Sequence, residues 1–117
     1  MRPDLKALRQ LSDLDQLLAG SAQRPVLLFK HSHSCGTSLE ALDQLIEHLD
    51  EARHHDTDYA VVTVQTHRDI SNAVSTRLGV RHETPQALLI RDGRVIWSAT
   101  HFRVTADAMA RALGELR

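Results

Sequence analysis

Hydrophobic positions along the chain alternate between short continuous runs and longer segments in which apolar residues recur every three or four positions. A continuous run bounded by turn residues is typical of a strand buried on both faces, whereas the longer spacing is typical of a helix packed on a sheet. The first continuous run is Val26 to Phe29, opened by Pro25, and the second is Tyr59 to Val64. The chain is therefore predicted to alternate strands with helices, as an α/β domain does.

Four segments carry the spacing of an amphipathic helix. Three of them begin near residues whose side-chain oxygens can cap a helix, which are Ser12, Asp69 and Thr105. Glycines can end the first two of these helices, at Gly20 and Gly79. The remaining helix is the clearest, because acidic residues line its solvent side and one face is aliphatic. That aliphatic face is predicted to be Leu39, Leu42, Leu45, Ile46 and Leu49.

The remaining strands come from a hairpin signal and from an ambiguous N-terminal segment. Ala87 to Ile90 and Val95 to Ser98 flank Asp92-Gly93, a pair of turn residues that both tolerate positive φ. Leu5 to Leu11 is ambiguous and is compatible with a short edge strand. The predicted order is (β)αβαβαββα, in which a central mixed β-sheet is flanked by helices within one domain spanning residues 1–117.

Composition limits the kind of partner. The chain has 117 residues, 42% of them hydrophobic, which is enough to build one core without disulfides. A single cysteine excludes an internal disulfide framework and, with no apolar leader after Met1, points to a reducing, cytoplasmic setting. The net charge of −1 is mixed along the chain, and no segment is long enough to span a bilayer. We therefore expect no nucleic-acid or membrane partner, but a small molecule or another protein.

The lone cysteine, Cys35, is the strongest candidate for chemistry. It lies between the buried run that ends at Phe29 and the predicted helix that begins near Gly36. A helix N-terminus carries unpaired N–H groups and about half a positive charge, which favours a thiolate over a thiol. A buried cysteine acting as a small hydrophobe is the alternative. The polar neighbours of Cys35 favour the nucleophile, and they are Ser34, Gly36, Thr37 and Ser38.

The order of the elements also indicates a particular fold. The predicted order consists of two βαβ crossovers, a hairpin and a last helix. With a cysteine at the start of the helix after a central strand, this order matches the thioredoxin fold. In that fold a cis-proline opens the strand before the hairpin and packs opposite the catalytic cysteine. Pro85, which follows Thr84, stands at that place in this chain. By analogy with the fold, the Thr84-Pro85 bond is predicted to be cis and to face Cys35.

Three separated segments resemble the monothiol bacilliredoxin family, the redox proteins of the bacillithiol system within the thioredoxin superfamily. They are Phe29 to Cys35, Gly79 to Ala87 and Asp92 to Trp97, and the similarity extends from about Leu11 to Leu113. The resemblance implies a cytoplasmic oxidoreductase that removes bacillithiol from mixed disulfides on S-thiolated client proteins. It also implies that the nucleophile is Cys35 and that the proline of the family is Pro85. No tightly bound cofactor is expected.

One departure from the family concerns the small thiol that serves as co-substrate. The family usually follows its cysteine with Pro-Ile-Ser, whereas this chain has Gly36-Thr37-Ser38. The resulting Cys-Gly-Thr-Ser tetrad is similar to the active-site sequence of monothiol glutaredoxins. Bacillithiol is therefore the expected low-molecular-weight thiol, with glutathione as the alternative.

The tetrad also limits the mechanism. In a dithiol Cys-x-x-Cys site the second cysteine resolves the mixed disulfide, and Ser38, which occupies that position, cannot. The cycle must therefore be monothiol, with a second small thiol releasing Cys35. Ser38 either donates a hydrogen bond to the thiolate or faces an N–H of the helix, and Gly36 either admits a bulky disulfide or serves the turn. The residues expected to bind the substrate are Lys30, His33, Gly36, Thr37, Ser38, Thr84 and Pro85.

Histidines near the cysteine raise a second hypothesis. His31, His33 and Cys35 alternate, so an extended backbone would direct all three to one side, and imidazole with thiolate suits zinc or copper. A metal carrier is thus one alternative, although a helix starting at Cys35 would break the alternation. Carriage of an iron–sulfur cluster by a dimer is another, suggested by the glutaredoxin-like tetrad alone.

The other histidines are given structural interpretations. His82 is expected to line the same groove as Pro85, because the two are close in sequence. His101, with Phe102, is interpreted as a structural corner after the last strand. The remaining four are predicted to face solvent, and they are His48, His54, His55 and His67.

Overall fold

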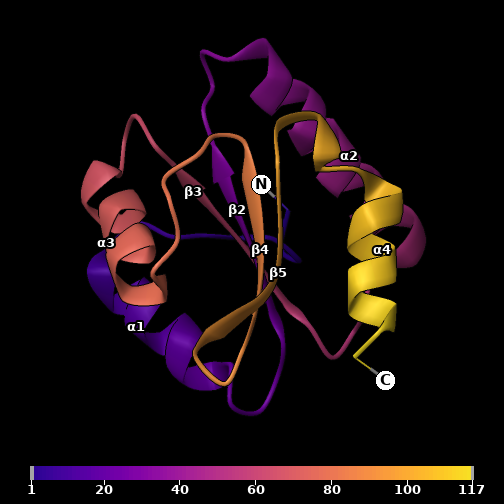
Figure 1. The fold of residues 1–117 in the computed structure, drawn as a ribbon, viewed down its shortest axis with the longest axis horizontal. Coiled ribbons are helices and arrows are strands. Elements are labelled where there is room, and N and C mark those ends of the chain that lie inside the picture. Colours follow the sequence, from indigo (N-terminus) through magenta and orange to yellow (C-terminus); the bar gives the residue numbers. More distant parts are fainter. Residues whose placement is uncertain (1, 117) are drawn as a thin grey trace.

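Five strands form one mixed sheet in the order β1-β3-β2-β4-β5 in this computed structural model, which describes residues 2–116 (Figure 1). The central strand β2 runs parallel to β3 and antiparallel to β4, and β1 lies at one edge. The strands are β1 Lys6–Ala7, β2 Val26–His31, β3 Asp58–Thr63, β4 Gln86–Arg91 and β5 Arg94–Thr100. The predicted thioredoxin-like order is confirmed, including the short edge strand.

Helices cover both faces of the sheet. Figure 1 shows α1 and α3 on one side of the strands and α2 and α4 on the other. The helices are α1 Leu11–Gly20, α2 Gly36–Ala52, α3 Arg68–Leu78 and α4 Ala106–Gly114, with the 3-10 turn η1 His101–Arg103 before α4. Among the described residues, no helix is long and apolar enough to span a membrane.

The two helix layers, α1 with α3 and α2 with α4, pack on opposite faces of β2, which explains its continuous apolar sequence. Leu28 packs with Leu14 of α1 and Val74 of α3. Phe29, which points the opposite way, packs with Leu45 of α2 and with Met109 of α4. Successive side chains of a strand alternate between its faces, so a strand covered on both must be apolar throughout.

Several local signals in the sequence act as predicted. Gly79 ends α3 with a φ of 64°, and Asp92 and Gly93 turn the hairpin with φ values of 52° and 72°. The hydroxyl of Thr105 caps α4 by accepting a hydrogen bond from the amide of Ala108 at 3.1 Å. These positions are predictable because few residue types meet such backbone demands.

The predicted caps of the first and third helices were wrong. The N-cap of α1 is Gln10, and the carboxylate of Asp13 accepts a hydrogen bond from the Gln10 amide at 3.2 Å. Ser12 therefore lies inside the helix. The N-cap of α3 is His67. Asp69 lies in the first turn, where its carboxylate still interacts favourably with the helix dipole. In both helices the carboxylate acts from within the first turn.

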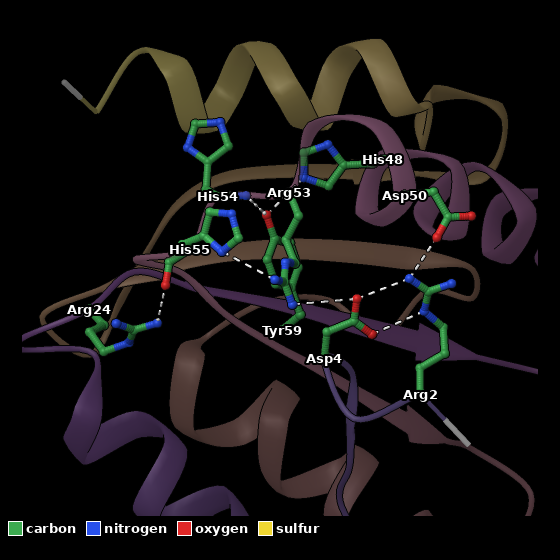
Figure 2. A network of polar contacts seen from close by, with 9 residues as sticks. All are labelled: Arg2, Asp4, Arg24, His48, Asp50, Arg53, His54, His55 and Tyr59. Carbon is green, nitrogen blue, oxygen red and sulfur yellow. Dashed lines mark hydrogen bonds and ion pairs between the residues drawn. The ribbon is translucent and has the colours of Figure 1, made fainter.

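The buried face of α2 also differs from the prediction, because polar residues occupy part of it. It comprises Ser38, Ala41, Leu45, His48 and Leu49. Leu39 is 47% exposed, whereas His48, predicted to face solvent, is 1% exposed. Nε2 of His48 lies 2.8 Å from the hydroxyl of Tyr59, whereas Nδ1 is buried without a hydrogen-bond partner (Figure 2). A helical stripe inferred from leucines alone therefore misses a histidine that has a buried partner.

Register brings the ends of three strands together at one end of the sheet. Lys30 near the end of β2 pairs with Gln86 at the start of β4, and Gln86 pairs with Thr100 at the end of β5. The turn into α2, the Thr84-Pro85 bond and η1 are attached to these three strand ends. The order of the strands thus collects Cys35, Pro85 and His101 at one end of the sheet.

Candidate active site

Cys35 is the N-cap of α2. Its backbone is extended, with φ −117° and ψ 121°, and its carbonyl accepts the hydrogen bond from Leu39 that opens the helix, at 3.1 Å. The thiol is free and partly exposed. The side chain therefore lies beside the unpaired amides of a helix N-terminus, which is the position that the sequence predicted.

A clamp that the sequence did not reveal holds the turn before Cys35. Gln65, just after β3, donates from Nε2 to the hydroxyls of Ser32 and Ser34, the latter at 2.9 Å. Its Oε1 accepts from the amide of His33 at 3.4 Å. β3 is parallel to β2, so the segment after β3 reaches the same end of the sheet as the turn after β2. A polar residue directly after a buried parallel strand was the available signal.

Ser38 is buried beneath the same turn. Its hydroxyl accepts a hydrogen bond from the amide of Ser32 at 2.9 Å and lies 2.9 Å from Nδ1 of His31. Burial, together with the neighbouring His33, lowers the pKa of His31 and favours its neutral ring. Neither role considered for Ser38 matches this contact, because the amide that its hydroxyl bonds is that of Ser32, which precedes the helix. That amide belongs to the turn before Cys35.

Gly36 and Thr37 occupy the first turn of α2. A Cβ added at Gly36 would meet nothing within 4 Å, so the space at Gly36 itself is open. Thr37 is partly exposed on the same turn, and His33 is exposed in the turn before it. These three expected substrate-binding residues therefore surround Cys35 along the chain and are accessible.

The Thr84-Pro85 bond is cis, as predicted. Pro85 is buried and directly precedes β4, and Thr84 is partly exposed outside the strand. The carbonyl of Pro85 accepts a hydrogen bond from the amide of His101 at 3.0 Å. His101 has a positive φ of 53°, which is uncommon for a residue other than glycine. The segment before β4 and the turn after β5 are thereby joined.

Lys30 lies on the other side of the sheet. Its side chain is fully buried on the face covered by α3, with Nζ 2.8 Å from the hydroxyl of Ser75 and 3.1 Å from Nδ1 of His82. Burial lowers the pKa of Lys30 to about 8. Burial and then the charge of Lys30 lower the pKa of His82. Lys30 thus contacts α3 and the loop before Pro85, on the face of the sheet away from α2.

The alternating histidines do not converge on Cys35. His31 ends β2 with its ring against Ser38, whereas His33 is exposed in the turn and Cys35 begins the helix. Among residues 2–116, no group of three or more histidine, cysteine, aspartate or glutamate side chains is placed to hold a metal ion. The geometry therefore gives no support to the metal-carrier alternative within one chain.

Comparison with solved structures identifies the same fold. A protein described as having a thioredoxin fold matches with a TM-score of 0.81 and 28% identity, over 94% of each chain. Fasciola hepatica thioredoxin matches with a TM-score of 0.75 and 14% identity, over 96% of this chain and 99% of that one. A poplar thioredoxin h gives a TM-score of 0.75 and 16% identity, over 97% and 96%. The latter two show the fold alone.

The family model described as monothiol bacilliredoxin BrxC matches residues 6–109. The match extends from β1 into α4 and includes the turn that carries Cys35 and the segment that carries Pro85. The protein therefore belongs to the monothiol bacilliredoxin family and is a thiol-disulfide oxidoreductase with a thioredoxin fold.

Proposed function

We propose that the protein removes bacillithiol from mixed disulfides on client proteins, with Cys35 as nucleophile. The observation that carries this proposal is the placement of the chain's only cysteine, partly exposed, at the N-terminus of α2. Membership of the bacilliredoxin family implies the use of bacillithiol. Ser38, the last residue of the tetrad, supports a monothiol cycle, because it stands where a resolving cysteine would and its hydroxyl accepts a hydrogen bond from the amide of Ser32.

In the first step the Cys35 thiolate attacks the bacillithiol sulfur of the client mixed disulfide. A new disulfide forms between Cys35 and bacillithiol, the original one breaks, and the client sulfur leaves as a thiolate that takes a proton from water. In the second step the thiolate of another bacillithiol attacks the bacillithiol sulfur held on Cys35. Oxidised bacillithiol and the Cys35 thiolate are released, so the client is reduced at the expense of one free bacillithiol thiol. The other bacillithiol of the oxidised product comes from the mixed disulfide.

The small thiol is proposed to contact residues around Cys35. Thr84 lies outside β4, so its backbone N–H and carbonyl can pair with the peptide-like part of bacillithiol. His33 and Thr37 present accessible polar groups on the turn and on the first turn of α2. Gly36 leaves room for the disulfide to approach the sulfur of Cys35.

Intact mass measurement tests the nucleophile and the co-substrate together. The protein is incubated with oxidised bacillithiol and, separately, with oxidised glutathione. We expect one bacillithiol adduct on the wild-type chain and none on Cys35→Ser, which should also fail to release bacillithiol from a model client. Ser98→Ala, which changes an exposed serine of β5 outside the turn, is the matched control and should form the adduct. An adduct with glutathione alone would refute bacillithiol as the co-substrate, and no adduct with either would refute Cys35.

A further inference from the structure

A groove lies beside the candidate active site, between the first turns of α2 and the η1 turn. Its volume is about 340 Å³. Thr37, two residues after Cys35, contributes to one wall, and His101, bonded to the carbonyl of Pro85, contributes to the other. The groove therefore begins at the two segments that carry Cys35 and the cis-proline.

Phe102 projects at the rim of this groove. The phenylalanine is 76% exposed, although such a large apolar side chain is more often buried. The turn that carries it is fixed at both sides. The amide of Val104 donates to the carbonyl of His101 at 3.2 Å, and the amide of Ala106 donates to Oε1 of Gln44 in α2 at 2.9 Å. Phe102 is thus an exposed apolar surface on a rigid support.

The opposite wall of the groove is acidic. Glu40 and Asp43 of α2 both line it and are exposed. Among the described lining residues there is no lysine or arginine, and His101 is the one basic side chain. Arg103 directly follows Phe102 in η1, but it does not line the groove. The charge and the exposed ring together suit a partner that is both basic and apolar.

We propose that this groove binds the client polypeptide next to its modified cysteine, with an apolar client residue on Phe102 and a lysine or arginine facing Glu40 and Asp43. This inference rests on the proposed function, because the client must present its mixed disulfide to Cys35. The groove then discriminates among clients, whereas the surroundings of Cys35 hold the small thiol that all clients share.

The test compares three substrates. Two are peptides carrying bacillithiol on a cysteine that is flanked by a leucine and by either two lysines or two glutamates. The third is a mixed disulfide of bacillithiol with cysteamine, which has no polypeptide to enter the groove. For the wild-type protein we expect kcat/KM to be about tenfold higher for the lysine peptide than for the glutamate peptide, the range that two exposed charge contacts supply.

Variants connect this preference with the groove. The double change Glu40→Gln and Asp43→Asn should bring the two peptides within about twofold of each other. Phe102→Ala should raise KM for both peptides about fivefold to tenfold, as loss of an aromatic contact does. All variants should process the cysteamine disulfide at the wild-type rate. Glu47→Gln, an exposed acid of α2 outside the groove, and Ile96→Ala, an exposed apolar residue of β5, are the matched controls.

The outcomes separate this inference from the proposed function. Equal kcat/KM for both peptides, or equal losses for peptides and cysteamine disulfide, would overturn the client groove while leaving the function in place. No turnover of any substrate would instead overturn the function. Analytical sedimentation of the wild type and of Phe102→Ala tests whether a second copy of the chain occupies the groove. Self-association that disappears in Phe102→Ala would assign the groove to a dimer and overturn the proposal, and a monomer in both cases supports it.

Discussion

The hydroxyl of Ser38 and Nδ1 of His31 lie 2.9 Å apart, both buried at the base of the turn that leads to Cys35. The same hydroxyl accepts the amide hydrogen of Ser32. One side chain on α2 therefore satisfies two polar groups of the strand and turn that precede it. In this monothiol site, the position of a resolving cysteine holds a residue that fixes the backbone.

Ser38→Ala is expected to lower stability while leaving the chemistry of Cys35 available. The change leaves the Ser32 amide and the His31 ring without a buried partner, which costs about 1–3 kcal/mol in the free energy of unfolding. Urea denaturation measures this loss, and intact mass measures the bacillithiol adduct. Ser98→Ala, at an exposed serine of β5, should cost less than about 0.5 kcal/mol. Equal stability of Ser38→Ala and the wild type would contradict the structural role.

The buried His48 makes stability depend on pH. Burial, and next the neighbouring His54, lower the pKa of His48 in the folded protein. Below about pH 6.5 the unfolded chain binds a proton that the folded chain resists, so the free energy of unfolding falls as the pH falls through this range towards the folded pKa. Above pH 6.5 both states are neutral at this site, and its contribution is constant.

We therefore expect His48→Gln to weaken the pH dependence of unfolding. Glutamine does not titrate, and its amide can still bond the hydroxyl of Tyr59. The difference in slope is at most about 1.4 kcal/mol per pH unit, the value for one proton. Denaturant unfolding from pH 8 to pH 5 measures both slopes. The pKa of His31 is also lowered by burial, so His31 should preserve part of the pH dependence of unfolding in His48→Gln. Parallel curves for the two proteins would show that His48 titrates alike in both states.

Replacement of Lys30 by methionine is expected to stabilise the protein at neutral pH. Burial lowers the pKa of Lys30 from 10.5 to about 8, which corresponds to a cost of roughly 3 kcal/mol for the charged form at pH 7. Methionine fills a similar volume without that cost, although the contacts with Ser75 and His82 are lost. We expect Lys30→Met to raise the free energy of unfolding by about 1–2 kcal/mol at pH 7.

The sign of this effect can be followed with pH. Between pH 8 and 10.5 the folded chain has released the proton of Lys30 and the unfolded chain retains it, so the wild type gains stability as the pH rises. The advantage of Lys30→Met should therefore shrink across this range. Lys6→Met, at an exposed lysine of β1, is the matched control and should show no such trend relative to the wild type. A constant difference between Lys30→Met and the wild type would exclude a burial cost.

The sequence predicted the fold more completely than the site, for a physical reason. The fold signals are local properties of the chain, and each one marks a single element of the structure. They are the periodicity of strands and helices, Gly79 at the end of α3 and the Asp92-Gly93 turn. The position of Cys35 at a helix start is local too. The clamp by Gln65 is a contact between residues about thirty positions apart, and it depends on the parallel pairing of β2 and β3.

Side-chain direction accounts for the other differences. Lys30 was expected among the substrate-binding residues around Cys35, yet each residue of β2 points to the face opposite its neighbour's. Lys30 therefore points towards α3 while His31 points towards α2. His48 was expected in solvent, but it is buried and its partner Tyr59 lies on another element. Pairings of this kind become visible only once the elements are packed.

Gly36 provides the last test, because the resemblance to the family places proline at this position. Gly36 is the first residue of α2, where the N–H has no partner within the helix and proline is favoured. The preceding Cys35 has φ −117° and ψ 121°, within the range that a residue before proline adopts. An added Cβ meets nothing within 4 Å. The position is therefore compatible with proline in every respect that the backbone determines.

We expect Gly36→Pro to raise the free energy of unfolding by about 0.4–1 kcal/mol, because proline restricts the unfolded chain more than the folded one. The melting temperature should rise by a few degrees, since about 1 kcal/mol shifts a domain of this size by roughly 4 °C. Thr37→Pro is the matched control one position later. There the preceding residue, Gly36, is helical and proline disfavours that conformation, so the control should destabilise. A lower melting temperature for Gly36→Pro would mean that Cys35 does not keep its extended backbone at the start of α2.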